Sequence, residues 1–160
     1  QDNPTVNIQN SAVWVNDEVK TFHLSEEYTD GSSLLNSLNN LREEHSIKIP
    51  CFDFSTWLSE TFDEDDYLIL KLDIEGAEYE VLNKMIEDGS INLINEFWGE
   101  WHDMKISDKK TLKTSKKVYK YLEDKGIEFK EWEIHIPTHG KSHPQLAFRP
   151  NNLNDLDNTI

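Results

Sequence analysis

The sequence has a single cysteine, Cys51, in 160 residues. One thiol cannot form a disulfide within the chain, and a zinc cluster built from several cysteines is excluded. Such cysteine usage is typical of a reducing compartment, so we expect a cytoplasmic protein. The sequence also lacks any apolar run near the roughly 20 residues of a membrane-spanning helix, so we expect no membrane partner.

Basic residues are also few. The sequence has 16 Lys and Arg residues and 31 Asp and Glu residues, which gives a net charge of -15. This charge repels phosphate backbones, so nucleic acid is a poor partner and a neutral or cationic substrate fits better. The hydrophobic content of 36% and aromatic content of 11% are those of a globular protein. The length and composition therefore predict one ordinary domain with its own core.

Glycine is scarce as well, and the six glycines at positions 31, 76, 89, 99, 126 and 140 are scattered. No two of them form a Gly-x-Gly pair, so the sequence contains no glycine-rich dinucleotide-binding turn of that type. No signal peptide is visible, but the sequence begins with Gln1 rather than methionine. We therefore expect any targeting segment to precede these residues.

Residues 68–82, LILKLDIEGAEYEVL, pass from an apolar segment into a cluster of acids without a break. The apolar run at 68–72 predicts a central parallel strand covered by helices on both faces. Asp73 and Glu75 then lie at the C-terminal edge of that strand, where open α/β sheets bind their ligands. The sequence therefore predicts a functional site at this edge.

Upstream of that strand, periodicity predicts strands over 6–15, 19–25 and 47–52 and a helix over 54–62. Asn16 and Asp17 form a plausible tight turn, which predicts that the first two strands pair as a hairpin. Residues 28–46 are polar and predict a loop with a short helix. Asp53 or Ser55 is the expected N-cap of the helix.

Downstream, the pattern predicts a helix after Gly76, a strand over 91–101, a lysine-rich helix, and strands over 127–137 and 145–150. Gly89 and Gly126 are the expected helix stops, and Ser107 is the expected cap of the second helix. The last two strands have no helix between them and should form an antiparallel hairpin. Residues 151–160 read as a frayed tail.

The segment KLDIEGAE, Lys71 to Glu78, follows an Ala-Val strand at 12–13 and a Ser-Ser-Leu loop at 32–34, and precedes INEFWGEWH. These motifs, in this order, resemble the FkbM family of S-adenosylmethionine-dependent methyltransferases over residues 5–150. The resemblance implies an α/β fold with a Rossmann-like class I methyltransferase sheet, closed by an antiparallel hairpin. It also implies a domain over residues 1–150, followed by the tail at 151–160.

The sequence departs from the family pattern in one respect. Methyltransferases of this fold begin with a strand and a glycine-rich turn that cradles the methionine end of the cofactor, followed by a strand whose final acid holds the ribose. Neither is present here. The resemblance therefore implies a partial domain from about the third strand onward, with little activity for these residues alone. Either the first part lies upstream of Gln1, which the missing methionine favours, or the chain is a degenerate relative of the family.

The resemblance also implies roles for individual residues. Asp73 would contact both cofactor and substrate, with Glu75 and His102 as further catalytic residues and His102 a possible general base. The other residues that it implies are Ser11 and Ala12 for cofactor binding, and Glu100 and Trp101 for substrate binding.

Each of these residues also has a structural interpretation. Asp73 is a candidate helix N-cap, and Glu75 and Glu78 are candidate first-turn acids that stabilise the helix dipole. Lys71 interrupts an apolar strand, so we expect it to pair with a nearby carboxylate. Trp101 is also a candidate for the core or the cleft wall.

The resemblance thus implies S-adenosylmethionine-dependent O-methylation of a sugar or other small hydroxyl compound, with a nitrogen acceptor as an alternative. The partner would be a small molecule or saccharide. One alternative is a non-catalytic scaffold that kept the sheet, and another is a metal-dependent hydrolase that uses Asp73, Glu75, Glu100 and His102. We assign no metal ligand at this point, although a divalent metal remains an alternative.

Overall fold

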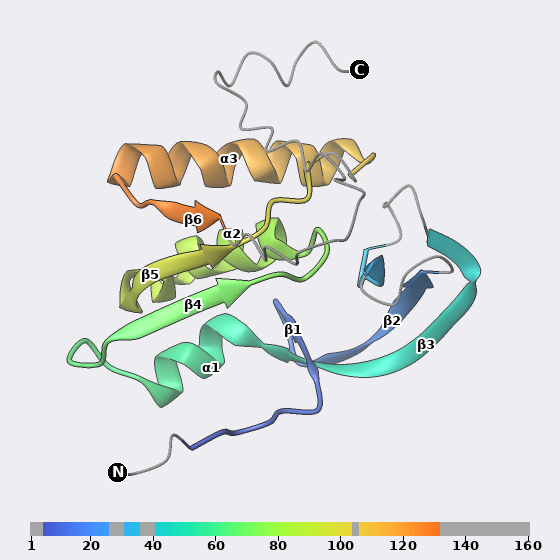
Figure 1. The fold of residues 1–160 in the computed structure, drawn as a ribbon, viewed down its shortest axis with the longest axis horizontal. Coiled ribbons are helices and arrows are strands. Elements are labelled where there is room, and N and C mark those ends of the chain that lie inside the picture. The colour runs from blue at the N-terminus through green and yellow to red at the C-terminus, as the bar shows by residue number, and fades with distance from the viewer. Residues whose placement is uncertain (1–4, 26–30, 36–40, 104–105, 132–160) are drawn as a thin grey trace, which may run out of the picture.

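The computed structural model describes residues 5–25, 31–35, 41–103 and 106–131, without the side chains of residues 41–44 (Figure 1). Strands and helices are mixed in this part of the chain, so the fold class is α/β, as predicted. The strands form two three-stranded sheets, with orders β1-β3-β2 and β4-β5-β6. The predicted C-terminal hairpin and the tail lie outside the described residues.

The first sheet contains β1 (Ala12–Trp14), β2 (Glu18–Ser25) and β3 (Leu41–Asp53). The predicted hairpin between the first two strands is wrong, because β3 lies between them. Cys51 is the register partner of Ala12 in the parallel β1–β3 pair and of Glu18 in the antiparallel β2–β3 pair. Residues 41–46, predicted as part of a loop, belong to β3. Strand β3 is thus the central strand of this sheet, paired with both β1 and β2, and its residue Cys51 is buried.

The second sheet is fully parallel and contains β4 (Leu68–Leu72), β5 (Ile94–Gly99) and β6 (Phe129–Glu131). The connection from β4 to β5 contains α2 (Glu78–Asp88) and a 3₁₀ turn at Ser90–Leu93, and α3 (Lys109–Lys125) follows β5. This strand–helix alternation is the one that the sequence predicts. It places the residues after β4 and β5 at one edge of the sheet.

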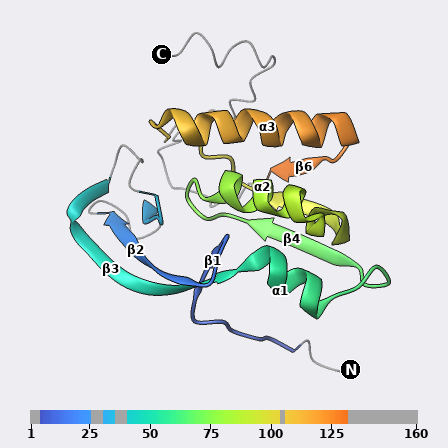
Figure 2. The ribbon, with the colours of Figure 1, turned by 180° about the vertical axis from the view of Figure 1, so that it is seen from behind.

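Strand β4 forms at the predicted residues, but it is not covered on both faces. Within the described chain its only strand partner is β5. Its residues alternate in burial, with Ile69 61% exposed and Leu72 2% exposed. Helix α2 covers one face of the sheet, and no described helix lies over the other face in Figures 1 and 2. The expectation of a fully covered central strand is therefore wrong for the described part of the chain.

Two apolar clusters position the helices against the sheets. The larger cluster joins α1 (Phe54–Thr61), α2 and α3 to the second sheet, and its buried members include Leu58, Leu72, Leu82, Phe97 and Val118. The smaller cluster contains Trp14, Leu34, Cys51 and Ala77. Because Ala77 immediately precedes α2, this smaller cluster docks the first sheet against the start of that helix.

The helix ends agree with the sequence in most respects. The Asp53 side chain accepts a hydrogen bond from the Thr56 N–H and caps α1, and α2 ends at Gly89, whose φ is 82°. Helix α3 is capped by Asp108 rather than by the expected Ser107.

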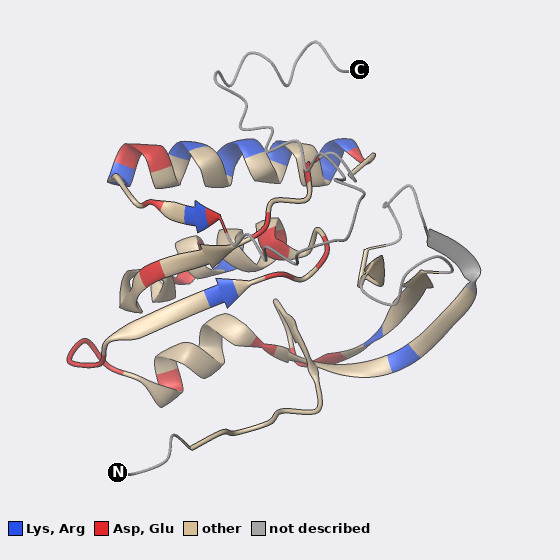
Figure 3. Cartoon of the chain, viewed as in Figure 1, with Lys and Arg blue, Asp and Glu red and all other residues tan. Residues whose placement is uncertain are grey.

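Charge is distributed unevenly over these elements. Lysines follow the length of α3, whereas acids gather in the loop before β4 and in the turn after it (Figure 3). None of the described helices combines the length and hydrophobicity needed to cross a bilayer.

Candidate functional site

The turn between β4 and α2 is built from two consecutive residues with positive φ. Glu75 has φ 52° and Gly76 has φ 93°. A left-handed conformation is unfavourable for a residue with a Cβ and costs glycine little, so Gly76 suits this position and Glu75 is held in it against its preference. Gly76 therefore serves the tight strand-to-helix turn expected of it.

Glu78 holds this turn from inside. Its side chain is 0% exposed, its Oε1 accepts the Ile74 N–H at 2.8 Å, and its Oε2 accepts the Gly76 N–H at 2.8 Å. These bonds satisfy donors that precede the helix. Glu78 is therefore a buried residue that organises the turn, whereas the sequence predicts a solvated first-turn acid. A charged residue on the apolar side of a helix was the available signal.

His102 lies beyond the end of β5 and faces the same turn. Its side chain is 1% exposed, and its Nδ1 donates to Glu78 Oε1 at 2.9 Å. Its Nε2 lies 3.5 Å from Glu75 Oε1 and 3.9 Å from Glu100 Oε1. The structure thus brings together Glu75, Glu100 and His102, all expected site residues, around the unexpected Glu78.

The carboxylates around His102 determine its charge. Burial by itself lowers the pKa of the imidazole, but the neighbouring Glu75 and Glu78 carboxylates more than offset this and raise the pKa from 6.5 to about 10. In the absence of another cation, His102 is therefore an imidazolium at neutral pH. In that form it donates hydrogen bonds and does not accept a proton.

Asp73 lies at the exposed end of β4. Its Oδ2 is 3.1 Å from Lys71 Nζ, and the side chains of the two residues are 38% and 41% exposed. The expected pairing of Lys71 with a carboxylate is therefore confirmed. The alternative of Asp73 as a helix cap is wrong, because the N-cap of α2 is Ala77 and no side chain caps it.

Ser33 connects the first sheet to this turn. Its hydroxyl donates to the Glu75 carbonyl at 2.7 Å, and its backbone pairs with His23. Ser33 belongs to the Ser-Ser-Leu motif at 32–34, in which the sequence predicts no site residue. Ser33 is 1% exposed, and its bond to the Glu75 carbonyl helps to hold Glu75 in its unusual conformation.

The two expected cofactor residues of the first sheet, Ser11 and Ala12, are half-buried. Ala12 packs against the cluster that contains Trp14 and Ala77, which places it near the start of α2. The Ser11 hydroxyl is buried and has no hydrogen-bond partner. Ala12 is therefore connected to the site through the apolar cluster at Ala77.

Trp101 is embedded in aromatic side chains. Its ring stacks on Tyr79 with centroids 5.5 Å apart and tilts against Phe129 at 4.2 Å. Tyr119 completes this group and donates a hydrogen bond to Asp103. Burial raises the pKa of the Asp103 carboxyl and of the Tyr119 hydroxyl. Neighbouring Glu100 remains about half exposed. In the segment 100–103, Glu100 therefore faces outward, while the other three side chains pack against the domain.

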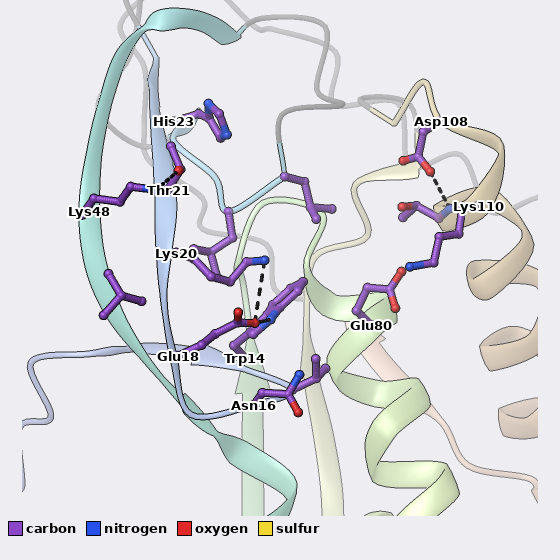
Figure 4. Close-up of a pocket in the computed structure, with 15 residues that line it drawn as sticks. Trp14, Asn16, Glu18, Lys20, Thr21, His23, Lys48, Glu80, Asp108 and Lys110 are labelled. Atoms are coloured by element: carbon purple, nitrogen blue, oxygen red, sulfur yellow. Dashed lines mark hydrogen bonds and ion pairs between the residues drawn. The ribbon is translucent and has the colours of Figure 1, made fainter.

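A cavity of about 720 Å³ lies between the first sheet and the starts of α2 and α3 (Figure 4). Trp14 and Lys20 line one side, and Glu80 and Lys110 line the other. The Lys20 ammonium lies 4.3 Å from the centre of the Trp14 ring. The cavity is thus polar and carries both signs of charge.

The described residues do not form a complete site for S-adenosylmethionine. An acid stands at the end of β4, and small residues stand at the start of β1, but the sequence has no Gly-x-Gly turn. The second sheet also has no described strand on the outer side of β4. Within the described residues, the glycine-rich turn that the resemblance implies for the methionine end is therefore absent.

The arrangement places carboxylate oxygens and one imidazole nitrogen together at one edge of the sheet. Single ligand atoms of Asp73, Glu75 and His102 all lie within 4.8 Å of one another. Carboxylates at this spacing can accept hydrogen bonds from a hydroxyl group, accept its proton, or bind a cation.

Comparison with known proteins gives one positive finding. A family model described as the methyltransferase FkbM domain matches residues 5–129. The match includes the first sheet, strands β4 and β5 and the whole acidic turn, and it ends at Phe129, the first residue of β6. Comparisons with curated proteins and with solved structures found no significant match.

Proposed function

Because the chain belongs to the methyltransferase FkbM domain family, we propose that it takes part in methyl transfer from S-adenosylmethionine to a hydroxyl oxygen of a sugar or another small molecule. Family membership supports a methyltransferase in general. The choice of a hydroxyl acceptor rests on the site, where the exposed groups are mainly hydrogen-bond acceptors. S-adenosylmethionine would supply an electrophilic methyl group.

The observation that carries this proposal is the position of Asp73. It stands at the C-terminal end of β4 and is partly exposed, and Glu75 and His102 lie beside it. A carboxylate there accepts a hydrogen bond from an acceptor hydroxyl and fixes the direction of the oxygen lone pairs. Alignment of this kind is the main contribution a protein makes to a bimolecular displacement.

The proton of the acceptor hydroxyl would go to a carboxylate. His102 is a poor base in this arrangement, because a pKa of about 10 keeps it protonated at neutral pH. Its role in the proposal is to hold Glu75 by charge attraction across 3.5 Å. Asp73 and Glu75 would therefore accept the proton or its hydrogen bond, with His102 as a positioning residue.

Glu100 and Trp101 extend the site along the end of β5. Glu100 is exposed enough to bind a further hydroxyl group, which suits a sugar with several of them. Trp101 would shape the wall of the site through its packing on Tyr79. We propose a small molecule or saccharide as the partner, in keeping with the net charge of -15.

The test is a methyl-transfer assay on the product of the complete open reading frame, with isotopically labelled S-adenosylmethionine and a panel of saccharides and small alcohols. The labelled methyl group should appear on a hydroxyl oxygen of at least one acceptor. Transfer to amines alone would contradict the hydroxyl acceptor. Absence of cofactor binding in that product would contradict an enzyme and favour a scaffold.

A further inference from the structure

The donor atoms at the end of β4 and β5 have the composition of a metal site. One ligand atom each from Asp73, Glu75 and His102 lies within 4.8 Å of the others. We propose that these three residues bind one divalent first-row transition-metal ion. The proposal does not rest on methyl transfer, because it concerns only the side chains of this chain.

The buried Nε2 atom of His102 is the observation that separates this site from a surface cluster of acids. The histidine side chain is 1% exposed, and Nε2 has no hydrogen-bond partner. It lies 3.5 Å from Glu75 Oε1, on the side of the ring away from Glu78. Nε2 therefore faces the Glu75 carboxylate without a hydrogen bond to it, which is the position of an atom that could bind a metal ion.

Glu78 prepares His102 for this role. The carboxylate accepts the Nδ1 proton at 2.9 Å and thereby leaves Nε2 to face Glu75. Metal-binding histidines commonly donate their other ring N–H to a carboxylate, which fixes the ring and raises its basicity. Glu78 is itself held by the Ile74 and Gly76 N–H groups, so the backbone of the turn sets the direction of the imidazole.

The charges of the neighbourhood also favour a cation. Glu75, Glu78 and Glu100 lie against His102, and a ligand atom of Asp73 lies within 4.8 Å of those of Glu75 and His102. Lys71 is the ammonium that pairs with Asp73. Both members of the Lys71–Asp73 pair are exposed, and exposed pairs contribute little to stability. Lys71 can therefore turn toward solvent when a metal ion takes its place at Asp73.

The donor set indicates the kind of ion. Two carboxylates and one imidazole, without a thiolate, suit Mn²⁺, Co²⁺ or Zn²⁺, whereas Mg²⁺ and Ca²⁺ prefer an all-oxygen environment. Three protein ligands leave coordination positions open to water or to an acceptor oxygen. The site would thus be an open one.

The experiment is a Mn²⁺ titration of the metal-stripped chain, followed by the electron paramagnetic resonance signal of free Mn²⁺, without cofactor or acceptor. Wild-type chain should show one saturable site. Glu75→Gln and Asp73→Asn should each weaken Mn²⁺ binding by about tenfold or more. Glu64→Gln, an exposed residue of the loop before β4, removes the same charge as Glu75→Gln and should leave the affinity unchanged.

Thermal melts of the same proteins separate metal binding from folding. Mn²⁺ should raise the melting temperature of wild-type and Glu64→Gln protein and have little effect on Glu75→Gln. The proposal is overturned by the absence of saturable binding, by equal affinities in wild-type and Glu75→Gln protein, or by equal losses in Glu75→Gln and Glu64→Gln. Because methyl transfer is not measured, a failure here leaves the proposed function untouched.

Discussion

Glu78 Oε1 lies 2.9 Å from His102 Nδ1, although the two residues are 24 positions apart and belong to segments that follow different strands. Both side chains are essentially inaccessible to solvent. This contact joins the turn after β4 to the segment after β5. It therefore fixes the position of the turn that carries Asp73 and Glu75 relative to the segment that carries Glu100.

Loss of the Glu78 charge should destabilise the fold. In Glu78→Gln the amide offers one oxygen to the two backbone donors and no negative charge to His102, so the free energy of unfolding should fall by about 3 kcal/mol. Glu80→Gln is the matched control, because a first-turn acid contributes only about 0.3 to 1 kcal/mol. Urea denaturation of both variants measures the difference. Equal, small losses would mean that Glu78 is an ordinary first-turn acid.

Stability should depend on pH through His102. Its pKa is 6.5 when exposed and about 10 in the folded protein, so the folded state binds the proton more tightly. This contribution is fully present below pH 6.5, decreases as pH rises, and is absent above pH 10.

The free energy of unfolding of the metal-free chain should therefore fall between pH 7 and pH 10, by at most about 1.4 kcal/mol per pH unit from this group. Denaturation at several pH values, compared with His102→Gln, isolates the effect from other titrating groups. An equal slope in both proteins would show that His102 does not carry it.

Gly99→Ala should disturb the sheet edge severely. A Cβ at position 99 would lie 2.0 Å from the Leu72 carbonyl oxygen and 2.7 Å from the Phe129 ring. Strand β5 would have to move away from β4, and we expect a loss of more than about 3 kcal/mol. Gly126→Ala has open space around it and only a φ of 65°, so it should cost about 1 kcal/mol. Thermal melts that rank the two variants in the reverse order would contradict this register.

The sequence predicted local features of the site better than its assembly. The strand at 68–72, the turn at Gly76 and the helix stops follow from apolar periodicity and from glycine at positions with positive φ. The acids at the strand end were recognised because ligands bind at that edge of α/β sheets. These signals lie within a few residues of one another.

The contacts between distant segments could not be read in this way. The position of Glu78 on the apolar side of its helix indicates burial, but nothing near it in the sequence identifies His102 as its partner. Likewise, the turn at Asn16 suggested a hairpin, whereas β3 inserts between the two strands and pairs with both. Pairing partners depend on the whole sheet, and local propensity does not encode them.

The chain of 160 residues alone should bind S-adenosylmethionine weakly. It has no Gly-x-Gly turn for the methionine end, and the second sheet has no described strand beyond β4 that could supply the acid expected for the ribose. Calorimetry should therefore give a dissociation constant above about 1 mM. Micromolar binding would place the cofactor in contacts other than those that the family resemblance implies.

The most direct test of the central claim is the rate of methyl transfer by the full open reading frame product and by its Asp73→Asn variant. Asp73 is exposed and caps no helix, so the variant should melt within a few degrees of wild type. If Asp73 aligns the acceptor, turnover should fall by about 100-fold or more, while Glu64→Gln keeps the wild-type rate. An Asp73→Asn enzyme that retains wild-type turnover would contradict the assignment of this sheet edge as the catalytic site.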